Sequence, residues 1–208
     1  MLAPGAARFL LPLTVAAALL GGGGVLAGGN PRIVLFGLLI ADLVLLAFFA
    51  QFFRDPERAP GPDIVSAADG RVRAVTEENG RCLVSVFMNV NDVHVNRFPL
   101  DAEVVEIRSS GSGFRPAYGE DAAHNVQRHY ALSTALGPVE VVQLTGIVAR
   151  RLVSLVHPGE HHRKGERLGM ILLGSRVDVY LPAARVVPLV TPGQRVYAGR
   201  TPIARERS

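Results

Sequence analysis

One side chain in this sequence is a candidate nucleophile, the hydroxyl of Ser175. Ser175 follows Gly174 between an apolar run and an alternating run, and a Gly-Ser pair pressed between strands can be strained. Such strain favours attack of the serine hydroxyl on the preceding carbonyl carbon. Taken alone, the Gly-Ser pair also fits an ordinary turn.

Composition excludes several other chemistries. Of the 22 Lys and Arg residues only Lys164 is a lysine, and it lies in a polar turn, so a lysine-bound carbonyl cofactor has a poor site. The single cysteine, Cys82, excludes an internal disulfide and a cysteine-rich metal site. The histidines lack metal-ligand spacing, so no metal is expected. Basic residues are not interleaved with aromatics, which argues against a nucleic acid partner.

Two apolar runs precede Ser175, at about residues 9–26 and 33–53. Each is close to the length of about 20 residues that a membrane helix needs. The turn between them, residues 27–32, predicts a helical hairpin that crosses the membrane and returns. A cleaved signal peptide followed by a single anchor is the alternative for the first run.

The basic residues around these runs predict their orientation. Arg8 precedes the first run, Arg54 and Arg58 follow the second, and the connecting turn holds only Arg32. The positive-inside rule therefore places both ends, and the domain that follows, on the cytoplasmic side of the cell membrane. Arg54 and Arg58 would also meet phosphate head groups there.

The rest of the chain predicts a mostly β soluble domain, so we expect an anchor at residues 1–58 and a β-rich domain at residues 59–208. Short β-branched runs alternate with turn residues. Two glycine-marked turns share one spacing, which predicts paired hairpins like those of barrel-sandwich, lipoyl-type domains. The clearest strand runs are residues 82–87, 102–107, 139–144 and 177–181, and the matched turns are Pro158-Gly159 with Gly165 and Pro192-Gly193 with Gly199.

Several motifs in order carry a resemblance that covers nearly all of the β-rich part. They are Phe52-Phe-Arg-Asp-Pro-Glu-Arg58, Ser66-Ala-Ala-Asp-Gly70, Asn91-Asp-Val-His-Val-Asn-Arg97 with Pro99, Phe114-Arg-Pro-Ala117, Gly146-Ile-Val-Ala-Arg-Arg151 and Leu173-Gly-Ser-Arg176. Together they resemble the phosphatidylserine decarboxylase proenzymes, in particular the short form with two membrane spans. Each motif alone would be weak, whereas their order is specific.

The resemblance implies a self-processing enzyme. Ser175 attacks the Gly174 carbonyl, the chain is cut into residues 1–174 and 175–208, and Ser175 becomes a pyruvoyl group. The two fragments then form a heterodimer. The pyruvoyl carbonyl reacts with the amine of a serine phospholipid and serves as the electron sink for loss of carbon dioxide, so phosphatidylserine becomes phosphatidylethanolamine.

The resemblance also assigns helpers, with one departure. It points to Asp69 and His94 as the acid and base groups. Longer family members carry a second histidine three residues after the first, where this chain has Arg97. Arginine cannot act as a base. Either His94 serves both proton transfers or another group starts self-cleavage, and Arg97 could instead bind the substrate carboxylate or phosphate.

Two other functions remain open from the sequence. One is a non-enzymatic, membrane-anchored adaptor with a lipoyl-like domain, for which the Gly-Ser run would have no purpose. The other is a pyruvoyl decarboxylase acting on a different amino-group substrate, against which the anchor argues. The exact serine lipid, the base for self-cleavage and any higher oligomeric state are not predicted.

Overall fold

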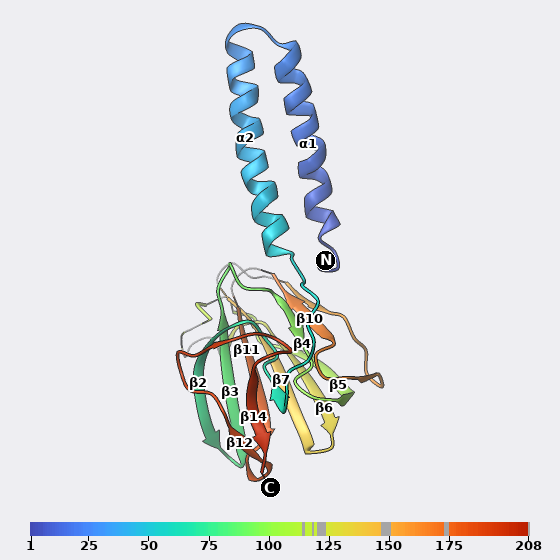
Figure 1. Cartoon of the computed structure of the whole chain (residues 1–208), viewed down its shortest axis with the longest axis vertical. Coiled ribbons are helices and arrows are strands. Elements are labelled where there is room, and N and C mark those ends of the chain that lie inside the picture. The colour runs from blue at the N-terminus through green and yellow to red at the C-terminus, as the bar shows by residue number, and fades with distance from the viewer. Residues whose placement is uncertain (114, 118, 120–123, 147–150, 173–174, 208) are drawn as a thin grey trace. The chain divides into compact units, whose positions relative to one another are not determined.

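The computed structural model describes residues 1–113, 115–117, 119, 124–146, 151–172 and 175–207. They form two compact units, Met1–Pro56 and Glu57–Ser208. The first unit is helical and the second is built almost entirely of strands (Figure 1). The predicted class, a mostly β domain preceded by two apolar helices, is confirmed.

The helical unit contains α1 (Ala7–Leu26) and α2 (Gly29–Phe52), both long and apolar enough to cross a membrane. Small residues let the two helices approach, since the Cβ position of Gly24 lies 3.2 Å from the ring of Phe36. α2 begins earlier than the expected residue 33. Pro31 is accommodated in its first turn, where a helix does not need the missing N–H.

The β unit contains fourteen strands and one short 3-10 helix among its described residues. They are β1 (Ile64–Val65), β2 (Gly70–Glu78), β3 (Arg81–Met88), β4 (Val95–Arg97), β5 (Ala102–Ser110), β6 (Gln127–Thr134), β7 (Gly137–Thr145), β8 (Leu152–Ser154), β9 (His161–His162), β10 (Arg167–Ile171), β11 (Ser175–Pro182), η2 (Ala183–Arg185), β12 (Val186–Pro188), β13 (Arg195–Val196) and β14 (Pro202–Glu206). All four runs expected to be strands lie within β3, β5, β7 and β11.

The strands form one large sheet and two small ones. The large sheet has the order β13-β2-β3-β11-β7-β6-β5-β9, and the small sheets have the orders β4-β10-β8 and β1-β14-β12. β11 therefore lies between β3 and β7, near the middle of the large sheet (Figure 1). Its alternate residues Val177, Val179 and Leu181 enter the hydrophobic core.

The matched glycine turns predicted a repeat, and the structure contains one. Gly165 and Gly199 both have positive φ, +85° and +73°, and the Cβ position of Gly199 lies 3.4 Å from Cα of Gly165. Each turn leads from an end strand of the large sheet, β9 or β13, to the middle strand of a small sheet, β10 or β14. The two repeats are thus matched corners between sheets where paired hairpins were expected, because β9 pairs with β5 and β13 pairs with β2.

Two glycines of the β2–β3 hairpin are required for different reasons, one for its turn and one for a close approach of the two strands. Asn79 and Gly80 both have positive φ and form the tight hairpin turn that an Asn-Gly pair favours. Gly70 has φ of +149°, and a Cβ there would lie 2.1 Å from the carbonyl oxygen of Phe87. Only glycine lets β2 pass this close to β3.

We predict that Gly70→Ala destabilises the protein by roughly 3 kcal/mol or more, because the methyl group collides with backbone. Gly80→Ala is the matched control, since its Cβ position has nothing within 4 Å, and should lose only about 1 kcal/mol from its conformation. Thermal unfolding of the detergent-solubilised chain measures both. Equal losses would show that the close approach of β2 to β3 is not a constraint.

Candidate active site

Ser175 is the first residue of β11 and is fully buried. It pairs with Met88 of β3 on one side and with Thr145 of β7 on the other. Its hydroxyl donates to the sulfur of Met88 at 3.4 Å. A thioether is a weak acceptor, so the hydroxyl is held in place without a strong hydrogen bond. Gly174, the other half of the predicted cleavage site, lies outside the described residues.

His94 is fully buried in the connection between β3 and β4. Its Nδ1 lies 2.8 Å from the carbonyl oxygen of Asp92. A carbonyl only accepts, so Nδ1 carries the hydrogen of this contact, and in a neutral ring Nε2 would be the nitrogen that can take a proton. The carbonyl oxygen of His94 accepts from the amide of Ile171, which fixes this histidine beside the end of β10.

Asp69 is held in the corner before β2 by an arginine. Both guanidinium nitrogens of Arg58 contact its carboxylate, at 2.5 and 2.8 Å, and the Ala198 amide donates to the same carboxylate at 2.8 Å. Arg58 also donates to the carbonyl oxygen of Ala198. Three donors therefore engage the two oxygens, which leaves the Asp69 carboxylate little capacity for a further hydrogen-bond donor.

Arg97 lies in β4 with its side chain buried. Its Nη1 donates to the carbonyl oxygen of Gly165 at 2.8 Å, and its side chain packs beside Gly199. The arginine that replaces the family's second histidine thus braces the two matched corners. A role in substrate binding stays a prediction.

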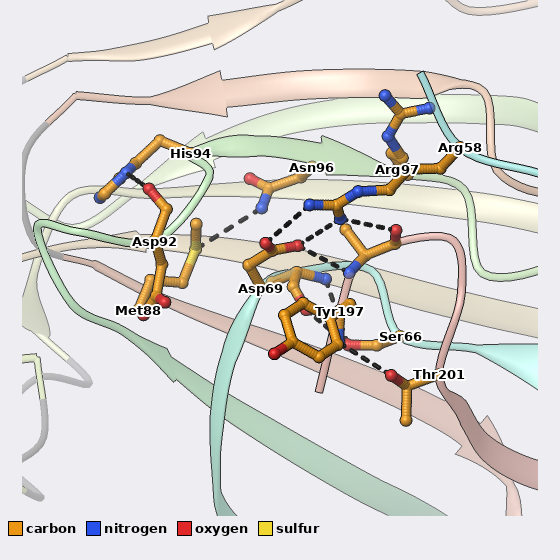
Figure 2. A network of polar contacts seen from close by, with 12 residues as sticks. Arg58, Ser66, Asp69, Met88, Asp92, His94, Asn96, Arg97, Tyr197 and Thr201 are labelled. Atoms are coloured by element: carbon orange, nitrogen blue, oxygen red, sulfur yellow. Dashed lines mark hydrogen bonds and ion pairs between the residues drawn. The ribbon is translucent and has the colours of Figure 1, made fainter. Parts of the chain in front are cut away.

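Figure 2 shows Asp69 and His94 in the same region as Met88, the residue that the hydroxyl of Ser175 contacts. Within the part of the chain that the structure describes, the three candidates are not joined directly by hydrogen bonds. The hydrogen bonds of Asp69 go to Arg58 and Ala198, and the hydroxyl of Ser175 points to Met88. Neither residue is hydrogen-bonded to His94 among the described residues. Each candidate is therefore held by a different contact: Ser175 by Met88, His94 by the Asp92 carbonyl and Asp69 by Arg58.

A chain of buried polar groups lies behind Ser175, and the sequence did not reveal it. The amide nitrogen of Asn96 contacts the sulfur of Met88 at 3.6 Å, on which Ser175 also rests. Gln143 donates to Asn96 at 2.7 Å and accepts from the hydroxyl of Tyr130 at 3.1 Å. These residues come from four strands, so only the strand register brings them together.

Arg58 was expected at lipid head groups, and the structure places it on Asp69 instead. The sequence places Arg58 at the end of the Phe52–Arg58 motif, and this position does not indicate which residue it contacts. The pair is well buried, with side-chain exposures of 9% and 4%. The charge of Arg58 is thus committed to the site.

Another buried carboxyl, that of Asp178, lies three residues beyond Ser175 on the same strand. Burial raises its pKa, and its neighbours Arg176 and Ser85 offset this only in part. Side chains alternate along a strand, so Asp178 faces the opposite side of the sheet from Ser175. It is therefore excluded as the base that activates the serine.

The fold defines the class of protein as a mostly β domain preceded by two helices apolar enough to cross a membrane. Comparison with known proteins then gives the family. The family model described as phosphatidylserine decarboxylase matches residues 45–204. The chain belongs to the phosphatidylserine decarboxylase family, and the resemblance predicted from the motifs is confirmed.

Individual relatives match along most of their length. A protein of Thermobifida fusca named phosphatidylserine decarboxylase proenzyme is 40% identical over 207 residues, covering 99% of this chain and 93% of that protein. One of Streptomyces coelicolor with the same name is 39% identical and covers 99% and 92%. A Halobacterium salinarum protein, named provisionally an archaetidylserine decarboxylase proenzyme, is 42% identical over 170 residues, covering 80% and 85%.

We predict that Arg58→Leu alone destabilises the chain by roughly 3–5 kcal/mol, because it leaves the Asp69 carboxylate buried without its counter-charge. Arg58→Leu combined with Asp69→Leu should recover most of that loss. Urea unfolding in detergent of the unaltered chain, of Arg58→Leu, of Asp69→Leu and of the double variant gives the coupling free energy. Arg185→Gln, which removes an exposed ion pair with Glu206, serves as the control. Additive losses would mean that the two charges are independent.

Proposed function

We propose that this chain is the proenzyme of a membrane-bound, pyruvoyl-dependent phosphatidylserine decarboxylase, with residues 1–58 as anchor and residues 59–208 as catalytic domain. The observation that carries the proposal is the placement of Ser175. It is a fully buried serine that opens a strand paired on both sides, in a chain that belongs to this family.

The proenzyme cuts itself before Ser175. The serine oxygen adds to the Gly174 carbonyl carbon, the peptide C–N bond breaks, and an ester forms while the hydroxyl proton passes to the new amine. Loss of the Cα proton then expels the Gly174 carboxylate and leaves dehydroalanine. Addition of water releases ammonia and leaves the pyruvoyl group at the start of the 175–208 fragment.

The pyruvoyl carbonyl supplies the electron sink for decarboxylation once it has formed. The chain's own residues handle protons and charge around it. His94 is buried and its Nδ1 is held by the Asp92 carbonyl, which suits its imidazole to take the Ser175 proton during cleavage and later to return one to the substrate carbon. Asp69 with Arg58 provides fixed charge at the site, and Arg97 contributes guanidinium donors toward the substrate carboxylate or phosphate.

The two fragments stay together after cleavage as a heterodimer. β11 begins at Ser175 itself, so a cut before it leaves the strand hydrogen-bonded to β3 along residues 175–182 and to β7 along residues 175–180. Its apolar side chains remain in the core. The 175–208 fragment therefore contributes strands to both the large sheet and a small sheet.

A lipid substrate fits the helical unit, since α1 and α2 can cross a membrane. Phosphatidylserine presents its amine and carboxylate at the membrane surface, where an anchored domain can reach them. The arginine distribution around the two helices supports a catalytic domain on the cytoplasmic side of the cell membrane.

Ser175→Ala should leave the chain as one uncut, inactive polypeptide, because alanine has no hydroxyl to attack the carbonyl. Intact mass measurement of the unaltered protein should give two fragments, with a pyruvoyl terminus on the 175–208 piece. An intact 22.2 kDa chain that still releases carbon dioxide would contradict the proposal, as would cleavage of the Ser175→Ala chain.

Assays with two substrates separate the alternatives. Carbon dioxide release from phosphatidylserine in vesicles supports a lipid enzyme. Release from free amino acids alone would favour a pyruvoyl enzyme for soluble substrates, and an uncut, inactive chain would favour the adaptor.

Met88→Leu should slow self-cleavage about fivefold, the equivalent of one lost weak hydrogen bond of about 1 kcal/mol. The swap nearly conserves volume, so the fold should tolerate it. Met170→Leu is the control, because Met170 is also buried but lies in β10, whereas Ser175 pairs with Met88 of β3. Pulse-labelled chains resolved by size give the cleavage rate. An unchanged rate in Met88→Leu would show that the sulfur does not orient the serine.

A further inference from the structure

One residue, Asp92, shapes the whole connection that carries His94. Its backbone amide donates to the carbonyl oxygen of Asn89 at 2.9 Å, and its carboxylate accepts from the Asn89 amide at 2.8 Å. Its own carbonyl oxygen accepts a hydrogen bond from Nδ1 of His94 (Figure 2). The turn between Met88, which contacts Ser175, and His94 is therefore closed by Asp92.

The carboxylate of Asp92 is itself anchored from a distant part of the chain. Its other oxygen contacts Nη2 of Arg195 at 2.5 Å. Asp92 is buried, whereas the side chain of Arg195 is 45% exposed. The charge of Asp92 raises the pKa of Arg195 above its ordinary value, so the guanidinium stays charged.

Arg195 lies in a segment that also contacts the region of Asp69. Arg195 lies in β13, whose next residue, Val196, pairs with Gly70 directly after Asp69. The same segment supplies the Ala198 amide that binds Asp69. One short stretch of the 175–208 fragment thus holds both Asp69 and the turn that carries His94, and both of these belong to the 1–174 fragment.

We propose that Arg195 is a positioning residue for His94: its ion pair with Asp92 fixes the turn of residues 89–94, so that the Asp92 carbonyl holds the ring with Nε2 toward the reaction. The inference rests on the proposed function for its catalytic consequence. Its geometric part, the tautomer of His94, does not depend on cleavage or activity.

The first experiment uses the uncut Ser175→Ala chain in detergent and reads the ring nitrogens of His94 by ¹⁵N NMR, assigned with a His94→Asn variant. The unaltered turn should show hydrogen on Nδ1. Arg195→Gln should give a mixture of tautomers, and Arg195→Lys should restore the first state. A His94 spectrum that is the same in Arg195→Gln would overturn the proposal, whether or not the unaltered chain is an active enzyme.

The second experiment follows the cleaved enzyme with phosphatidylserine vesicles. Arg195→Gln should lower kcat about tenfold, with KM within about twofold, because the ring and not the lipid site is disturbed. Asp92→Asn keeps an acceptor for the Asn89 amide but loses the ion pair, so it should match Arg195→Gln. The double variant should be no worse than either single one.

Arg185→Gln provides the matched control, since it removes an exposed ion pair from the same fragment and should leave kcat unchanged. Arg195→Lys should recover kcat to within about threefold. Multiplying losses in the double variant, or a kcat unchanged by Arg195→Gln, would overturn the positioning role. An unaltered chain that is neither cut nor active would instead overturn the proposed function.

Discussion

The structure depends on the pairing of β11 along both of its edges. This strand contacts β3 on one side and β7 on the other, and it places Ser175 at its first position. A strand of a large sheet's interior is held by two hydrogen-bond ladders and by its buried alternate residues. The proposed nucleophile therefore lies at the first position of a strand that is paired on both sides.

Three buried carboxylates of this domain each form an ion pair with an arginine. Arg58 engages Asp69, Arg195 engages Asp92, and Arg176 engages Asp178 on the far face of the sheet. Burying one member alone would be costly, because an isolated charge loses its hydration. Pairing lets carboxylates be fixed beside Ser175 and His94 while neither residue is tied to them directly.

The sequence predicted the fold class, the strand runs and the matched glycine turns because these follow from local alternation and turn chemistry. It did not predict that these turns form corners between sheets, since that depends on which distant strands pair. Ser175, His94 and Asp69 were named through a resemblance, and the structure places all three in one region. The partners were not predictable, since Met88, Asn96 and Gln143 meet only through strand register, which local pattern does not specify. The same limit hid the pairing of Arg58 with Asp69, residues separated by a proline- and glycine-rich linker.

The thioether beside Ser175 suits both ends of the proposed maturation. A carboxylate or carbonyl in that place would accept a strong hydrogen bond from the serine hydroxyl. After conversion to the proposed pyruvoyl group, the same oxygen would face a carbonyl oxygen, and two acceptors would repel each other. Sulfur is a poor acceptor and a polarizable, apolar neighbour, so it loses little when its donor disappears. Met88 is thus a compatible neighbour for a serine hydroxyl and for a ketone. The side chains around residue 175 need not rearrange when the serine is converted.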